Sequence, residues 1–510
     1  MRLHDLDAGD DLSTPNSPGT PSQVCEPDFS VARQQPAMSI PRSRSVLATA
    51  ACALSSLLAD AGRAQVPVGS AVVGTSSGPG TTGTAGLFLV TLPGGVVTPI
   101  TGLPGYLNST GPTPTQQGVG SVAYRSSDGA IVVGTVAQPG GPTGGAVELI
   151  LYYLNGSAVD PLRTRSIVLG TTTTSAAGAW VTVLPDDRIL AIGGPCSTGW
   201  LATGPVIVDP ATLAATPLPI PPIPLTGAGG GVTVDPTGRY VYLAATAAPG
   251  SASMVASLYR WDLATNTACT IVSWFGELIQ GLTCDDDGTV YVSAGTLSPP
   301  THSIHRVTPN GCGPATWTTT INPRTVPPSG LALDRASGQY LVAGGGFGPG
   351  FPTTDFNTLT LFDAVTLVAT PVAGGPTVWG NMGRSVAVHN AIDSYGAPSN
   401  GLNRYWLANF PNPAGQPVVG NLGFALTVQS DPALPAPLLS VLALSFGRGS
   451  LQLLGIDLLV DATTMVVLPT FSLPIPNNPN LVGAVLTAQS VHVENNGALA
   501  ASRGYEITVH

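Results

Sequence analysis

The stretch "GLTCDDDGTVYVSAG", Gly281–Gly295, decides the fold because variants of it recur along the chain. Successive copies start 49 to 59 residues apart. Each copy reads as an apolar strand, a tight polar turn and a second strand rich in Val, Ile, Leu and Tyr, which is the pattern of a β-hairpin. The other copies are "SVAYRSSDGAIVVGT" from Ser121, "WVTVLPDDRILAIGG" from Trp180, "GVTVDPTGRYVYLAAT" from Gly231, "GLALDRASGQYLVAGG" from Gly330 and "SVAVHNAIDSYG…NRYWLAN" from Ser385.

A second hairpin follows the first within a repeat, as in "SLYRWDLATNTACTIV" (Ser257–Val272), "HSIHRVTPNGCGPATW" (His302–Trp317) and "TLTLFDAVTLVATPV" (Thr358–Val372). Each repeat therefore holds four strands. A four-stranded unit at this period is typical of a β-propeller blade, and blades pack radially because one blade cannot bury both of its faces. The 63 Gly and 49 Pro residues agree with an all-β fold, since both residues punctuate strands and interrupt helices.

The pattern "VTVDPTGRYVYLA" resembles the broad family of secreted bacterial YVTN/NHL/SMP-30-like β-propellers. The resemblance covers roughly residues 66–410. It implies the fold and leaves the function open, because that family includes lactonases, lyases and pure binding modules.

The two ends of the repeat region predict how the ring closes. Ser70–Thr101 aligns with a blade that begins at its second strand, and Arg384–His389 could supply the missing inner strand. This pairing would hide two strand edges and give a six-bladed propeller. Asn403–Asn409 competes for the same second-strand position, so a seven-bladed ring with one irregular blade remains the alternative.

The repeat stops before the C-terminus. Residues 411–421 read as a linker, and residues 422–510 contain strand-like runs separated by Pro, Gly and Asn. This spacing predicts a small β-sandwich. A helix remains the alternative for "LQLLGIDLLVD" (Leu451–Asp461), and a role of this region in surface attachment or sorting is open.

The N-terminal region predicts export. From Met38, the chain carries the basic residues Arg42 and Arg44, an apolar stretch over Val46–Leu58, and small residues up to Ala64. This is the layout of a secretory signal peptide over residues 38–64, so cleavage near Ala64 and a secreted or cell-surface location, periplasmic or extracellular, are expected.

Residues 1–37 are interpreted as a disordered leader or a mis-called start. The formal charge of −10 and the pI of about 4.9 argue against nucleic acid as a partner, since nucleic acid requires basic patches. No later run is long and apolar enough to predict a membrane span. The mature chain is expected to be a monomer.

Two motifs invite a metal-site interpretation. Asp285, Asp286 and Asp287 align with turn residues of the other repeats, where Asp accepts backbone N–H bonds and a following Gly supplies positive φ. A calcium loop would need spaced ligands, so a turn is favoured over a metal site. His302 and His305 are three apart on a predicted strand and point to opposite faces, so we interpret them as blade-surface histidines.

Four cysteines follow the signal peptide. Cys269 and Cys312 fall at equivalent turns of successive repeats and are predicted to form a disulfide, as an exported protein allows. Cys284 aligns with an apolar column and is predicted to be a buried free thiol. Cys196 is the fourth.

The central mouth of the ring is the candidate ligand site. The residues at or near the start of the inner strands that could contact a ligand there are Gln117, Gln280, Ser329, Asn381 and Arg384. Lactonase-type relatives hold a divalent cation with carboxylates in the mouth, and these positions contain none. We therefore assign no catalytic residue and no cofactor, with a divalent cation such as calcium as the alternative.

The sequence thus favours an exported, non-catalytic binding or cell-surface interaction protein whose ligand is an unidentified protein or glycan. The ligand is expected over the loops between second and third strands, for example Ala137–Gly145 and Gly345–Asn357. The alternative is an SMP-30-like (lactonase-type) hydrolase or a propeller lyase with its site in the central mouth.

Overall fold

A computed structural model describes most of the chain beyond the predicted signal peptide. The described residues are 66–77, 86–105, 107, 117–137, 143–172, 177–195, 204–223, 228–247, 254–296, 301–322, 330–335, 337–344, 358–374, 382–407 and 415–510. The predicted leader, the signal peptide, Cys196 and most of the two ligand-facing loops lie outside these ranges. No helix within them is long and apolar enough to cross a membrane.

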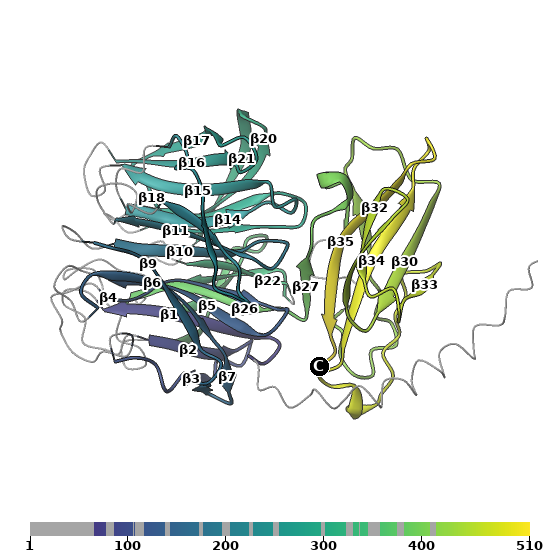
Figure 1. Cartoon of the computed structure of the whole chain (residues 1–510), viewed down its shortest axis with the longest axis horizontal. Helices are drawn as coiled ribbons and strands as arrows, with labels where there is room; N and C mark the ends of the chain where they lie inside the picture. The colour runs from purple at the N-terminus through teal and green to yellow at the C-terminus, as the bar shows by residue number, and fades with distance from the viewer. Residues whose placement is uncertain are drawn as a thin grey trace, which may run out of the picture. The chain divides into compact units, whose positions relative to one another are not determined.

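The repeats fold into antiparallel series of four strands, in the chain order that the sequence predicts (Figure 1). Three series form separate four-stranded sheets: β14 (Ala228–Val234), β15 (Tyr240–Ala247), β16 (Val255–Asp262) and β17 (Thr267–Phe275); β18 (Leu278–Cys284), β19 (Val290–Gly295), β20 (His302–Asn310) and β21 (Gly313–Asn322); β22 (Leu331–Asp334), β23 (Gln339–Ala343), β24 (Thr358–Asp363) and β25 (Val368–Gly374).

Three more series are joined into one 12-stranded sheet. Their strands are β26 (Met382–His389), β1 (Ser70–Ser77), β2 (Gly86–Thr91) and β3 (Val97–Pro99); β4 (Gln117–Arg125), β5 (Ala130–Ala137), β6 (Ala146–Tyr152) and β9 (Arg165–Thr171); β10 (Ala177–Val183), β11 (Ile189–Pro195), β12 (Pro205–Val208) and β13 (Ala215–Pro217). Two-residue pairings between strand ends, β1 with β4 and β5 with β10, join neighbouring series.

The first strands of all these series line one central cavity, which makes the arrangement a β-propeller. Apolar side chains fill the space between neighbouring blades: Val72 and Leu89 of one blade pack with Val119 and Ile131 of the next. A short extra hairpin, β7 (Leu154–Asn155) with β8 (Ala158–Val159), lies between β6 and β9 and accounts for the longer first step of the repeat.

The predicted pairing of the two ends of the repeat region is confirmed. β26 pairs with β1 in antiparallel register from Ser70↔His389 to Ser76↔Met382. β1 then pairs with β2, and β2 with β3, so β26 supplies the inner strand of a blade whose other strands come from the start of the described chain.

The predicted end of the propeller near residue 410 is wrong. β27 (Ile392–Tyr395) pairs with β35 (Leu499–Thr508), and β28 (Tyr405–Leu407) pairs with β29 (Val428–Ser430). The hairpin pattern of the last repeat misleads because β26 already has its partner in β1. The chain therefore leaves the propeller directly after β26, about twenty residues earlier than the repeat suggests.

The C-terminal region, called here the C-terminal module, is built from strands as expected. A five-stranded sheet has the order β27, β35, β34 (Val485–Val493), β30 (Leu439–Ser445) and β33 (Val466–Leu468). β31 (Arg448–Leu453) and β32 (Ile456–Val460) form a hairpin over Leu454 and Gly455, so the helical alternative for this stretch is wrong. Two 3-10 helices complete the described elements, Ser399–Gly401 and Pro479–Leu481.

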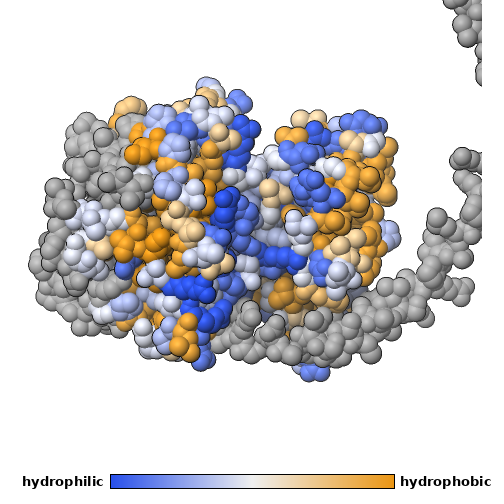
Figure 2. All heavy atoms as spheres, viewed as in Figure 1, coloured by the Kyte–Doolittle hydropathy of each residue, from blue (hydrophilic) through white to orange (hydrophobic). Residues whose placement is uncertain are grey.

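Hydrophilic and hydrophobic residues are distributed unevenly over the surface of the molecule. Figure 2 shows hydrophilic residues gathering along the boundary between the propeller and the C-terminal module, and hydrophobic residues on the module's other side. Exposed apolar side chains of the module include Leu439, Leu451, Leu454 and Val467. The hydrophilic boundary is where the contacts between the two regions lie, as described below.

The structure joins Cys269 of β17 to Cys312, in the turn between β20 and β21, by a disulfide that links two neighbouring blades. The two residues are 43 apart in the chain. Closing a loop of this length restricts the unfolded chain and is worth about 4 kcal/mol. We expect the double variant Cys269→Ser, Cys312→Ser to lower the free energy of unfolding by that amount, measured by urea denaturation. Cys284→Ser, at the described free thiol, is the control, and an equal loss there would contradict the prediction.

Candidate functional site

Four inner strands carry β-bulges, two of them at the predicted mouth residues Gln280 and Arg384. The pairing register shifts at Gly120 in β4, Gly230 in β14, Gln280 in β18 and Arg384 in β26. A bulge leaves one residue out of the ladder and redirects its side chain. The backbone at these four aligned positions therefore departs from regular strand pairing. The aligned strand β10 has no such register shift at Ala179.

The bulges surround a narrow channel cavity of about 90 Å³. Its lining comes from the six inner strands and consists of Gly120, Ser121, Val122, Trp180, Val181, Gly231, Val232, Gln280, Gly281, Leu282, Gly330, Leu331, Ser385 and Val386. Glycine is required where strands meet closely, since a Cβ on Gly330 would lie 2.5 Å from the Cα of Ser385. Pockets for small molecules usually measure about 300–1,000 Å³, so this cavity is too small for one.

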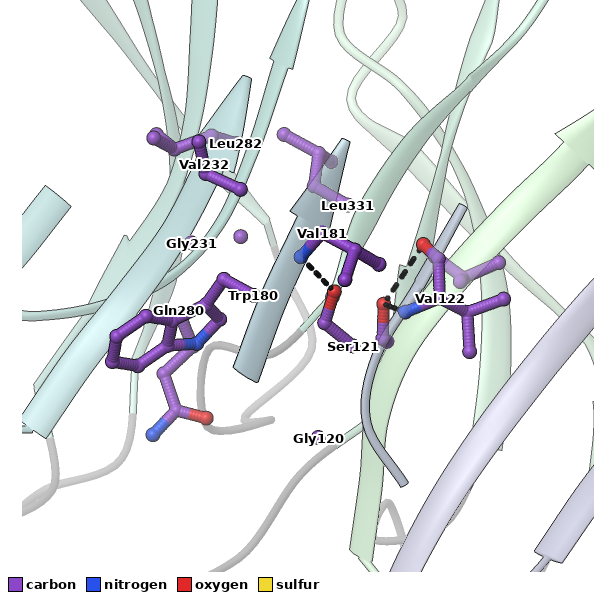
Figure 3. A pocket seen from close by; sticks show the side chains of 14 residues that line it. Gly120, Ser121, Val122, Trp180, Val181, Gly231, Val232, Gln280, Leu282 and Leu331 are labelled. Atoms are coloured by element: carbon purple, nitrogen blue, oxygen red, sulfur yellow. Dashed lines mark hydrogen bonds between the residues drawn. The ribbon is translucent and has the colours of Figure 1, made fainter. Parts of the chain in front are cut away.

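The two serines of the cavity serve the fold. Ser121 Oγ accepts a hydrogen bond from the Val181 N–H at 2.8 Å, and Ser385 Oγ accepts one from the Val122 N–H at 2.8 Å (Figure 3). Both bonds connect neighbouring inner strands. The remaining polar side chains of the cavity, Trp180 and Gln280, lie toward the same end of it in Figure 3.

The structure places the predicted mouth residues as follows. Gln280 lines the cavity. Gln117 pairs with Ser77 at the start of β4, and Arg384 occupies the bulge of β26, but their side chains lie outside the described part. Ser329 and Asn381 also lie outside it. The structure therefore brings Gln280 to the channel and leaves the grouping of these residues a prediction.

The channel continues into a second cavity at the other end of the inner strands, called here the chamber, of about 270 Å³. Its apolar lining comes from the same inner strands that line the channel. Its polar lining comes from the turns between first and second strands and from the C-terminal module, and includes Tyr124, Ser126, Asp187, Arg335, Asn390, Asp393, Ser394, Tyr395 and Arg503. Sequence reasoning did not single out these residues as a site.

The triple aspartate directly follows Cys284, which lines this chamber. Asp285 and Asp287 cap the predicted turn: Asp285 Oδ1 accepts from the Asp286 N–H and Asp287 Oδ1 from the Thr289 N–H, both at 2.8 Å. Gly288 has φ +84°, as the turn requires. The turn interpretation is confirmed for these two residues. Asp235 accepts from the Tyr240 N–H of its own turn, and Asp334 accepts from the Ser337 hydroxyl of its turn.

Asp286 has a different role. Its side chain is 2% exposed and lies 2.8 Å from Arg335 Nη1, in the corresponding turn of the next blade, and 3.2 Å from Arg503 Nη1 of β35. Asn403 Nδ2 donates to its backbone carbonyl at 2.7 Å. Burial opposes the ionisation of Asp286, but the two guanidinium groups outweigh it and lower its pKa.

A second ion pair crosses the boundary between the propeller and the C-terminal module, from Arg448 to Asp187. Arg448 of β31 contacts Asp187 in the turn between β10 and β11, and its Nη2 lies 2.6 Å from Glu506 Oε2 of β35. The same guanidinium donates to Ser126 Oγ at 2.9 Å. The C-terminal module is therefore held on the turns of three blades by buried or half-buried arginines.

The side-chain carboxyl of Asp393 in β27 makes no ion pair or hydrogen bond with any other described residue. Burial in the chamber raises its pKa to about 7, with the charge of Glu506 adding to the effect and those of Arg335 and Arg448 opposing it. The buried Tyr124 Oη, also in the chamber, has no hydrogen-bond partner among the described residues. Among those residues, no group of three or more His, Cys, Asp or Glu side chains could hold a metal ion.

Cys284 also lines the chamber and makes no disulfide. Burial raises the pKa of its thiol well above the ordinary value, so the thiolate that nucleophilic chemistry needs is disfavoured. The predicted free thiol is present, and it lies at the edge of the chamber as well as against the core of its blade.

The prediction that His302 and His305 lie on the blade surface is wrong. They are 0% and 1% exposed, on opposite faces of β20, because both faces of a blade are covered by neighbouring blades. His302 Nε2 lies 3.0 Å from Ser293 Oγ, and His302 Nδ1 lies 3.1 Å from Asn322 Nδ2. Asn322 donates to Nδ1, so Nε2 carries the proton and donates to Ser293; His302 is then no base for this fully buried serine.

Comparisons with known proteins give distant likenesses only. The chain matches no protein-family model, and no curated protein matches it. Among solved structures, TolB from Acinetobacter baumannii has a TM-score of 0.38 at 14% identity over 68% of this chain and 73% of that one. A putative 6-phosphogluconolactonase from Bacteroides fragilis has a TM-score of 0.33 at 12% identity, covering 62% and 96%. Kuenenia stuttgartiensis hydrazine synthase has 0.37 at 11%, covering 68% and 89%. The fold assignment therefore rests on the strand pairings themselves.

Proposed function

We propose that the chain is an exported, non-catalytic β-propeller that acts as a binding or cell-surface interaction protein. The observation that supports this proposal is the small volume and the lining of the central channel. Its cavity of about 90 Å³ is lined mainly by glycine and aliphatic residues, and its two serines are used between strands. Reactions in propeller mouths need a substrate-sized space and groups that titrate or hold a metal.

In finer detail, we propose six blades followed by a small β-sandwich. The six four-stranded series, with β26 closing on β1, support the blade number, and the engagement of β28 with β29 weighs against a seventh blade. The apolar cluster around Phe424, Leu442 and Tyr505 supports a sandwich-like core in the C-terminal module. Signal-peptide cleavage near Ala64 and a monomeric mature chain belong to the same proposal.

The charged residues of the chamber have a structural role in this proposal. Arg503 pairs with Asp286 and Arg448 with Asp187 across the boundary, so the C-terminal module covers the turn face of the propeller. The opposite face, which carries the loops between second and third strands, then remains for an unidentified protein or glycan ligand.

The proposal predicts that the purified chain holds no stoichiometric divalent cation after dialysis and does not hydrolyse aldonolactones, with or without added calcium. Elemental analysis and a lactone hydrolysis assay measure the two quantities. Equimolar metal together with turnover that Gln280→Ala abolishes would establish the alternative, a lactonase-type hydrolase with Gln117, Gln280, Ser329, Asn381 and Arg384 in its mouth. The bulges at Gln280 and Arg384 are the observation that favours this alternative.

A further inference from the structure

An aromatic patch lies where the outer strands of two neighbouring blades meet, between β17 and β21. It consists of Trp274, Glu277, His305, Trp317, Thr319 and Ile321. Trp317 is 45% and Ile321 66% exposed, whereas Trp274 and His305 are buried. Trp317, Thr319 and Ile321 alternate along β21 and therefore share one face of the strand.

Stacking fixes the aromatic rings of the patch. The Trp274 and His305 rings are parallel within 8°, with centroids 4.5 Å apart. The Trp317 ring is nearly perpendicular to both, at centroid distances of 5.7 and 5.5 Å. Edge-to-face contacts of this kind are favourable, so Trp317 is held in one orientation although nearly half of it faces solvent.

His305 also positions the polar groups beside Trp317. Its Nε2 lies 2.6 Å from Glu277 Oε2, and its Nδ1 lies 2.9 Å from Thr319 Oγ1. A buried ring thus uses both nitrogens to orient two surface groups. The Glu277 side chain remains 22% exposed. Its Oε1 makes no hydrogen bond to any described residue. Preorganised polar groups beside a rigid aromatic ring form a binding site at low entropic cost.

We propose that this aromatic patch binds a neutral glycan, with a pyranose ring stacked on Trp317. The C–H bonds of a pyranose carry partial positive charge and suit the negative face of an indole ring. Its hydroxyl groups donate to the free oxygen of Glu277 and bond to Thr319. The carboxylate disfavours anionic glycans.

The extent of the patch favours a glycan over a protein. A standard protein interface buries about 800 Å² on each partner, and this patch offers two exposed large apolar side chains, Trp317 and Ile321. One sugar ring matches the size of one indole. The glycan proposal rests on the proposed export of the chain, since extracellular glycans lie outside the cell. It does not depend on what is proposed for the central channel.

Affinity electrophoresis in gels containing β-glucan, xylan, mannan or glycol chitin tests the proposal. We expect one of these polysaccharides to retard the chain, Trp317→Ala to weaken that affinity at least tenfold, and Glu277→Gln to weaken it severalfold. Ile321→Ser, at a side chain two-thirds exposed, gives a second reduction that does not depend on how Trp317→Ala folds.

Phe275→Ala is the matched control. Phe275 is 82% exposed and follows Trp274, so it points to the other face of β17. Its variant should bind like the wild-type chain. Retardation in no gel, or retardation that Trp317→Ala and Ile321→Ser leave unchanged, would overturn the glycan site. Neither result bears on the proposed function, which the metal and lactone assays test separately.

Discussion

Replacing Asp286 by asparagine is expected to lower the free energy of unfolding by about 3–5 kcal/mol. The carboxylate is 2% exposed and is the shared partner of Arg335 and Arg503, which are each 11% exposed. Asparagine keeps the shape of the side chain and removes its charge, so the two buried guanidinium groups lose the carboxylate that they share. The loss of one partner of a buried ion pair costs far more than the loss of a surface pair.

Asp287→Asn is the matched control, since Asp287 lies in the same turn and its carboxylate bonds to one backbone N–H, of Thr289. Its substitution should cost about 1 kcal/mol or less, the usual worth of such a bond. Urea denaturation of both variants measures the difference. Equal effects of the two substitutions would show that the turn alone, without the ion pairs, accounts for the stability contributed by the triple aspartate.

The two roles within "DDD" show what local sequence can predict. A turn depends on residues that are neighbours in the sequence, so the Asp and Gly positions of the repeat predicted it correctly. The partners of Asp286 lie 49 and 217 residues away, and no local pattern connects them. An arginine in the aligned turn of the next repeat, Arg335, was the one signal in the sequence that could have suggested a contact between blades.

Periodicity predicted the strands well and their surroundings less well. It correctly put His302 and His305 on opposite faces of a strand. It could not show that both faces are covered, because burial in a propeller comes from neighbouring blades and the alternation within one blade does not report it. The same limit applies to Ile392–Tyr395 and Tyr405–Leu407: they read as strands of a blade, but their partners are in the C-terminal module.

Of the mouth residues predicted from the alignment of the inner strands, Gln280 lines the channel, and Gln280 and Arg384 lie at β-bulges. Whether the predicted residues act together as a site stays a prediction. The chamber was not anticipated, because its polar lining combines turns of several blades with strands of the C-terminal module. Sites assembled from distant segments in this way require the three-dimensional arrangement.

Asp393→Asn is expected to stabilise the protein at pH 8 and to leave it almost unchanged at pH 4. The folded state raises the pKa of this carboxyl from 3.8 to about 7. Its contribution to stability is therefore fully present below about pH 4 and is lost as the pH rises through 7, because folding then buries an unpaired carboxylate. A pKa shift of three units corresponds to a loss of at most about 4 kcal/mol in the wild-type free energy of unfolding at high pH. The asparagine amide carries no charge, so the variant avoids this loss.

The difference between variant and wild type isolates this effect from other groups. Burial lowers the pKa of His302 to about 3 and that of His492 to about 4, so these histidines reduce stability as the pH falls. Asp285, whose pKa burial raises to about 6, acts in the same direction as Asp393. All three are unchanged in the variant and cancel in the difference.

The charges that act on Asp393 come from several elements: Arg335 and Asp286 in propeller turns, and Arg448 and Glu506 in the C-terminal module. Unfolding free energies from urea titrations at pH 4, 6 and 8 should therefore diverge progressively between the two proteins. The half-buried Asp363, whose pKa is lowered by the Thr366 N–H, provides a control of opposite sign: Asp363→Asn should lose stability above pH 4. Parallel curves for wild type and Asp393→Asn from pH 4 to 8 would mean that the carboxylate of Asp393 is hydrated or neutralised in the chamber.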